Sequence, residues 1–219
     1  MRVWQEPKPH YTYLISCDAS LGRDRDYSAF HVINMYNGQQ VAEFYSNRTP
    51  INDFAKILFN EGTLYNVAHI ICERNTIGNN LIDWLYNIYE YENLWADDKD
   101  DLGFQVTAKN RESILAQLEE AIRTDLIKIN STRTCDELMT FIITDSGKVA
   151  AERNHHDDLV MSLALAVHAY KNLLDTTPLE YVSSTNKEQQ PLMPSKDYKH
   201  SFKTSYGGMA EEDFKWLMK

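Results

Sequence analysis

Short apolar segments separated by turn residues occupy the first fifty positions of the chain. The segments 11–17, 28–36 and 40–46 have the length and the β-branched and aromatic content of strands, and an Asn-Gly pair at 37–38 separates the last two. Asn-Gly is a strong hairpin signal because both residues tolerate the positive φ angles of a tight turn. The pattern predicts three strands in an antiparallel meander. Residues 1–10 contain two prolines and no periodicity, which predicts a linker.

After residue 48 the hydrophobic period changes, and helical spacing alternates with short apolar segments. Helices are expected from Thr49 and Pro50, near Gly78, from a cap at Asn110 to Arg123, from a cap at Thr134 to 143, and over 154–174. Strands are expected at 67–72, 103–106, 126–129 and 148–151. Strands that alternate with helices pair in parallel and carry the helices on the faces of the sheet. The predicted fold class is therefore α/β, a mixed β-sheet in which an antiparallel meander is followed by parallel strands and flanked by helices.

The composition fits one domain with additional segments at its ends. The chain has 219 residues, of which 43% are hydrophobic and 25% are charged. We assign the domain to residues 11–174. Residues 175–219 contain three prolines among Ser, Thr, Lys and Gln, and we expect a flexible tail with a short terminal helix. No apolar run approaches the length of about 18 residues that a membrane-spanning helix needs, so we expect no contact with a membrane.

The formal net charge of −10 argues against a nonspecific nucleic-acid coat, because such proteins are basic. A nuclease remains compatible with this charge, since acids at an active site add negative charge and a partner can supply a basic surface. The three cysteines, Cys17, Cys72 and Cys135, lack the spacing of a zinc site, and we interpret them as buried, reduced thiols. The sequence also has no phosphate-binding loop of the ATPase type and no complete EF-hand.

Acidic residues follow or open the most apolar segments of the chain. Asp18 follows Tyr-Leu-Ile-Ser-Cys and Glu73 follows His-Ile-Ile-Cys, whereas Asp157 and Asp158 open a helix that is apolar nearly all round. Adjacent parallel strands end side by side, so we expect Asp18 and Glu73 at one edge of the sheet, with the start of the helix packed against it. Carboxylates are the ligands that Mg²⁺ and Mn²⁺ prefer. The pattern predicts a site for two divalent cations; the alternative is that these acids only cap strands and helices.

Further residues near these acids are candidates for the same site. Asp26, on the turn after the first strand, is a candidate fourth ligand. Asp157 is favoured as a ligand, with Asp158 as a second or alternate one, because helical phase does not decide between them. Candidates that could orient a ligand or a water, or contact a phosphate, are Asn75, His155 and His156, and Lys109 and Arg111 are further candidates for contacts with phosphates. For these accessory residues the alternative is an ordinary place in helix caps or on the surface.

Three motifs together resemble the C-terminal nuclease domain of the large terminase subunit of tailed double-stranded DNA bacteriophages. They are Asp18-Ala-Ser-x-Gly with Asp26 downstream, Ile-Ile-Cys-Glu73-Arg-Asn, and His-His-Asp157-Asp158-Leu-Val-Met-Ser-Leu-Ala, and the resemblance spans roughly residues 10–172. It implies a ribonuclease H-like fold and an endonuclease that cuts concatemeric double-stranded DNA during genome packaging. The implied cofactors are two Mg²⁺ or Mn²⁺ ions held by Asp18, Glu73 and Asp157 or Asp158.

The same resemblance implies partners and a location. The partners are double-stranded DNA, a packaging ATPase domain that this chain does not contain, the portal protein and the small terminase subunit. The location is the cytoplasm of the host cell, and residues 1–10 are then the end of an interdomain linker. Two alternatives stay open: a ribonuclease H-like polynucleotidyl transferase of the transposase or resolvase type, and a noncatalytic docking module.

Overall fold

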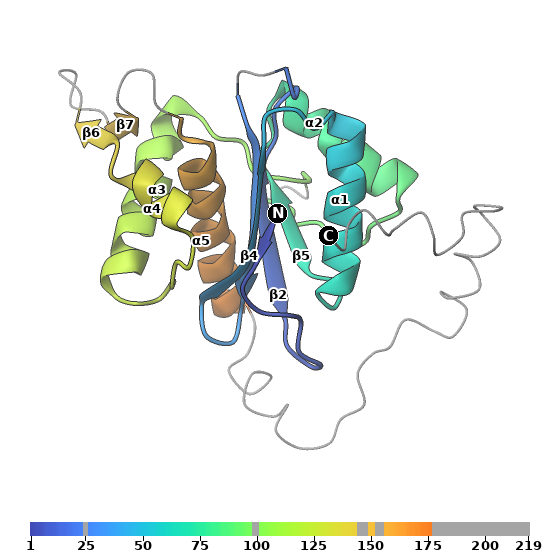
Figure 1. The fold of residues 1–219 in the computed structure, drawn as a ribbon, viewed down its shortest axis with the longest axis horizontal. Helices are drawn as coiled ribbons and strands as arrows, with labels where there is room; N and C mark the ends of the chain where they lie inside the picture. Colours follow the sequence, from blue (N-terminus) through green and yellow to red (C-terminus); the bar gives the residue numbers. More distant parts are fainter. Residues whose placement is uncertain (24–25, 98–100, 144–148, 152–155, 177–219) are drawn as a thin grey trace. The chain divides into compact units, whose positions relative to one another are not determined.

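The central sheet of the computed structural model has five strands in the order β1-β4-β3-β2-β5 (Figure 1). They are β1 (Arg2–Val3), β2 (Tyr13–Asp18), β3 (Ser28–Asn34), β4 (Gln39–Ser46) and β5 (His69–Cys72). The first four pair antiparallel, whereas β5 pairs parallel with β2. This is the mixed sheet predicted from the sequence. The structure describes residues 1–23, 26–97, 101–143, 149–151 and 156–176. For residues 142–143, 149–151 and 175–176 it describes the backbone alone.

Helices cover both faces of this sheet (Figure 1). One face carries α1 (Ile51–Leu64) and α2 (Thr76–Asp83), which continues into a π-helical turn, η1 (Trp84–Ile88). The other face carries α3 (Ala108–Arg123), α4 (Thr132–Leu138) and α5 (Asp158–Thr176). A separate antiparallel pair, β6 (Phe141–Ile143) with β7 (Val149–Ala151), lies between α4 and α5 in the chain. The predicted helix-flanked α/β fold class is confirmed.

Alternation along β2 sends successive side chains to opposite faces of the sheet. Tyr13, Ile15 and Cys17 are fully buried in the core on the α1 and α2 side. Leu14 belongs to the second core, which contains the apolar residues of α3 and α5. By the same alternation Asp18, the last residue of β2, faces α5. The strand pattern therefore decides the face of the sheet on which the first acid lies.

Two helix starts differ from the expectation because nearby hydroxyl side chains provide the caps. Thr107 is the N-cap of α3: its hydroxyl accepts a hydrogen bond from the Asn110 N–H, and the Asn110 side chain accepts one from the Thr107 N–H. Ser131 caps α4 through the Thr134 N–H, so Thr134 lies inside that helix. The helix is shorter than expected, and residues 141–143 form β6 instead.

Two segments expected as strands contribute isolated bridges. Residues 103–106 pair only through Phe104 with Glu73, and residues 126–129 only through Lys128 with Gln39, within the part of the chain that the structure describes. The Glu73 bridge lies one residue beyond the end of β5, and the Gln39 bridge lies at the first residue of β4, which pairs with β1 at Ala42 and Glu43. In addition, α1 starts after Pro50 with no side-chain cap, and α5 starts at Asp158 rather than at 154.

The first ten residues pack on the sheet. Arg2 and Val3 form β1 at the edge beside β4, and the Tyr65 hydroxyl donates to the Gln5 carbonyl at 3.0 Å. The connection of this segment to another domain stays a prediction.

Cys135 is exposed rather than buried, because α4 presents it to solvent. Among the described residues, no helix combines the length and the apolar character needed to cross a membrane.

Candidate metal centre

The first two acids meet at the ends of β2 and β5. Cys17 lies opposite Cys72 in the parallel ladder, and the Glu73 N–H donates to the Cys17 carbonyl at 3.2 Å. Both cysteine side chains point into the core on the α1 and α2 side, with their sulfur atoms 3.1 Å apart. The residue after each cysteine therefore faces α5. This register explains the shared sequence pattern, and it brings Asp18 and Glu73 side by side as predicted.

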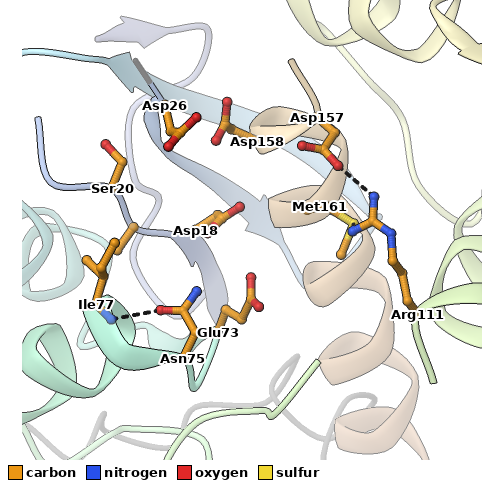
Figure 2. Close-up of a pocket in the computed structure, with 11 residues that line it drawn as sticks. Asp18, Ser20, Asp26, Glu73, Asn75, Ile77, Arg111, Asp157, Asp158 and Met161 are labelled. Atoms are coloured by element: carbon orange, nitrogen blue, oxygen red, sulfur yellow. Dashed lines mark hydrogen bonds and ion pairs between the residues drawn. The ribbon is translucent and has the colours of Figure 1, made fainter. Parts of the chain in front are cut away.

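The start of α5 brings two further acids to the same place. Figure 2 shows the Asp158 carboxylate beside that of Asp26 and over Asp18, whereas Asp157 turns toward α3. α5 is held on the sheet by a hydrogen bond from the Ser162 hydroxyl to the Ser16 carbonyl, 2.8 Å long. Tertiary packing of α5 on β2 thus completes the cluster that the strand ends begin.

These residues line an open pocket with a volume of about 270 Å³. Its lining consists of Asp18, Ala19, Ser20, Asp26, Glu73, Asn75, Ile77, Arg111, Asp157, Asp158 and Met161. Among these eleven residues there are five carboxylates and one guanidinium, so the pocket is strongly acidic. An acidic, open pocket of this kind suits a cation rather than an anionic or apolar ligand.

The environment of the acids opposes full ionisation. Burial, together with the charges of Glu73, Asp158 and Asp157, raises the pKa of Asp18 well above its usual range. Burial likewise raises the pKa of Asp158 to about 6, although a hydrogen bond from the Tyr27 backbone acts in the other direction. Clustered carboxylates of this kind carry a free-energy cost that a bound divalent cation removes.

Glu73 is positioned by its neighbour Asn75. Burial raises the pKa of Glu73, and a hydrogen bond from the Asn75 side chain partly opposes that effect. The side-chain oxygen Oδ1 of Asn75 also accepts hydrogen bonds from the N–H groups of Ile77 and Gly78, 3.0 and 2.8 Å long, and so caps α2. A single amide side chain therefore links the start of α2 to the carboxylate.

Hard carboxylate oxygens of this kind match the ligands that Mg²⁺ and Mn²⁺ prefer. As the side chains stand, however, no three His, Cys, Asp or Glu residues in the described ranges are drawn together closely enough to hold a metal ion. One reason is visible in Figure 2, where Asp157 pairs with Arg111 at 2.6 Å. The donor chemistry therefore fits a divalent cation, and binding would require the carboxylates to turn toward one another.

Some of the accessory candidates line this pocket and others do not. Arg111 lines it, but Lys109 is exposed on the first turn of α3 and does not line it. Asp26 is exposed at its rim. His156 lies 3.6 Å from Asp158 through its Nδ1 and packs edge-on against the Tyr27 ring. The prediction for His155 falls outside the described residues.

Sequence reasoning overlooked some of the residues around the pocket. Met161 lies one helical turn after Asp157, and this spacing could have identified it as a lining residue. Glu137 of α4 accepts a hydrogen bond from the Val160 N–H at 2.9 Å, and burial raises its pKa to about 8. No local pattern marks Glu137, because its role depends on the packing of α4 against the start of α5.

Comparison with solved structures shows the same fold in nuclease domains of large terminases. The large terminase nuclease from thermophilic phage G20c, solved with bound magnesium, is 23% identical over 76% of this chain and 85% of that chain, with a TM-score of 0.64. The Thermus phage P74-26 large terminase nuclease domain is 23% identical over 77% of this chain and 85% of that chain, with a TM-score of 0.63. No family model matches the chain. The chain therefore has the ribonuclease H-like fold of these domains.

Proposed function

We propose that this chain is the nuclease domain of a phage DNA-packaging terminase. Its activity is then metal-dependent endonucleolytic hydrolysis of concatemeric double-stranded DNA. The observation that carries the proposal is the meeting of Asp18, Glu73 and Asp158 in one open pocket, from two adjacent strand ends and a helix start. The shared fold with the large terminase nuclease from phage G20c, which has been solved with bound magnesium, cobalt and zinc, supports it.

The acids have distinct parts in this proposal. Asp18 and Glu73 hold the cation site on the rigid sheet, and Asp158 completes it from α5. Asp158 is the better candidate than Asp157 because its side chain is only 12% exposed, against 41% for Asp157, and faces the other acids. Asp157 and Asp26 are additional ligands. When bound, two Mg²⁺ or Mn²⁺ ions supply activation of water and stabilisation of the leaving oxygen.

The remaining residues orient groups and contact the substrate. Asn75 limits the rotation of the Glu73 carboxylate through its hydrogen bond. Arg111 at the pocket and Lys109 nearby on α3 are candidates for contacts with DNA phosphates. The net charge of −10 predicts weak DNA binding by this chain alone. Partners are therefore part of the proposal: a packaging ATPase domain, the portal protein and the small terminase subunit, in the cytoplasm of the host cell.

Cleavage of supercoiled plasmid tests the proposal directly. The wild-type chain is incubated with Mg²⁺, Mn²⁺ or EDTA, beside Asp18→Asn, Glu73→Gln and Asp158→Asn. We expect nicking and linearisation with either metal, none with EDTA, and a loss of at least about 100-fold in each variant, because each removes a charged ligand.

The matched control is Asp53→Asn, which makes the same chemical change at an exposed position of α1, on the other face of the sheet. Its cleavage rate should equal that of the wild type. Undiminished cleavage by Asp18→Asn and Asp158→Asn would refute the site assignment. Absence of cleavage by the wild type, together with absence of Mn²⁺ binding in calorimetry, would instead favour the noncatalytic docking module.

A further inference from the structure

A side chain of the protein supplies positive charge inside the acidic pocket. The Arg111 guanidinium donates to Asp157 Oδ2 through Nη2 at 2.6 Å, and its Nη1 contacts Met161 Sδ at 2.8 Å (Figure 2). Asp157 and Met161 are neighbours across one helical turn, since the Met161 N–H donates to the Asp157 carbonyl. The guanidinium is therefore held against the first turn of α5, and its side chain is 28% exposed.

Arg111 is the single cationic residue among those that line the pocket, beside five carboxylates. Its charge reaches beyond Asp157, because it also opposes the rise that burial causes in the pKa of Glu73. Carboxylates that are partly removed from water repel one another, and a positive charge within the cluster offsets that repulsion. Arg111 thus fills the electrostatic role of a counter-ion in this pocket.

The same contact keeps Asp157 apart from the other acids. In Figure 2 the Asp157 carboxylate turns toward α3, whereas those of Asp158 and Asp26 face each other over Asp18. The Asp157 oxygen that accepts from Arg111 has a charge-assisted hydrogen bond of 2.6 Å. That oxygen cannot bind a metal ion while it keeps this partner, so the guanidinium and a cation compete for it.

We propose that Arg111 is a latch on the cation site: its ion pair with Asp157 must open before Asp157 can bind a divalent cation. This inference rests on the proposed function, and it makes Arg111 a positioning residue as well as a candidate phosphate contact. Once released, the guanidinium is free to meet a DNA phosphate. Because cation and phosphate each remove one member of the pair, each should strengthen the binding of the other.

A double-mutant cycle on Mn²⁺ affinity tests the latch. Calorimetry gives the Mn²⁺ dissociation constant of the wild type, Arg111→Gln, Asp157→Asn and the double variant. We expect Arg111→Gln to bind Mn²⁺ about 3- to 10-fold more tightly than the wild type, the range that the loss of a partly exposed ion pair allows. In the Asp157→Asn background the same substitution should raise the affinity clearly less than it does in the Asp157 background, because the competing pair is already absent and only the loss of the positive charge remains.

Arg74→Gln is the matched control, since it removes the same charge next to Glu73 without touching Asp157. Arg74 pairs with Asp97 and Asp101, at 3.1 and 2.9 Å. Its effect on Mn²⁺ affinity should be the same with Asp157 or Asn at position 157. Melting temperatures in EDTA establish that each variant is folded.

The outcomes separate this inference from the proposed function. If the wild type binds Mn²⁺ and cuts DNA, but Arg111→Gln gains no affinity or gains equally in both backgrounds, the latch is wrong and the nuclease stands. If the wild type binds no Mn²⁺, both fail. Should Arg111→Gln not fold, the NMR signal of the Arg111 Nε–H in the wild type provides the test. It should shift as Mg²⁺ is added, and a signal unchanged at saturating Mg²⁺ overturns the latch.

Discussion

At the scale of single residues, Glu61 near the end of α1 is a half-buried acid remote from the pocket. Its Oε2 is one of the few buried polar atoms without a hydrogen-bond partner among the described residues. Burial and the charge of Glu6 raise its pKa from 4.5 to about 7, and the N-terminal ammonium opposes that rise. Between these two pH values the folded chain holds a proton that the unfolded chain has lost. The free energy of unfolding therefore falls as pH rises from about 4.5 to about 7.

Glu61→Gln should consequently stabilise the protein at pH 8 and leave its stability nearly unchanged at pH 4.5. The amide is neutral at both pH values, so it avoids the cost of a buried charge. After allowance for solvent screening we expect a gain of about 1 to 2 kcal/mol at pH 8, measured by urea unfolding at both pH values. Glu112→Gln, at an exposed position of α3, is the control. An equal gain at both pH values would show that ionisation of Glu61 is not the cause.

At the scale of elements, α2 supports the site through its close approach to β5. A Cβ added at Gly78 would lie 1.7 Å from the Glu73 carbonyl oxygen, so only glycine allows this distance. The first turn of α2 thus rests on the backbone of a candidate ligand, and Asn75 bridges the same helix to its carboxylate. A change in the position of α2 should therefore change the position of Glu73.

Gly78→Ala should weaken both the fold and the cation site. The added methyl group must push α2 away from Glu73, which we expect to cost about 2 kcal/mol or more in the free energy of unfolding. Urea unfolding and Mn²⁺ calorimetry measure the two effects. Asn79→Ala, at the next, exposed position of the same helix, should leave both values near those of the wild type. Wild-type Mn²⁺ affinity in Gly78→Ala would contradict the structural link between α2 and the site.

At the scale of the whole molecule, the parallel strands β2 and β5 are covered by helices on both faces of the sheet. Cys17 and Cys72 mark this burial because both are almost inaccessible to solvent, and burial raises the pKa of the Cys17 thiol. Cys135 of α4 is exposed. Thiol accessibility therefore reports whether the sheet stays closed.

Titration with a thiol reagent should detect one reactive cysteine in the folded chain and three in denaturant. The fast-reacting thiol is Cys135, since the other two thiols are buried and a reagent reaches them only when the sheet opens. Cys135→Ser is the control and should show no fast reaction until denaturant is added. Fast reaction of a second thiol in the folded wild type would contradict the closed packing of β2 on β5.

The local pattern of apolar and polar residues determined much of the fold. The meander, the parallel strand at 69–72 and the long apolar helix follow from periodicity alone, because each repeats over several residues. The same pattern determined that Asp18 and Glu73 lie at strand ends and that Asp157 and Asp158 lie at a helix start. Boundaries were less well predicted, since Thr107 and Ser131 compete locally with the caps that were expected.

Tertiary structure alone decided how these acids are used. Packing of α5 on β2 turns Asp158 toward Asp18, and packing of α3 on α5 brings Arg111 to Asp157 while Lys109 stays in solvent. A helix start presents neighbouring residues in different directions, and only the partners across the interface select one of them. The sequence therefore determined which residues could form a cation site, and the contacts between α3, α5 and the sheet determined their arrangement.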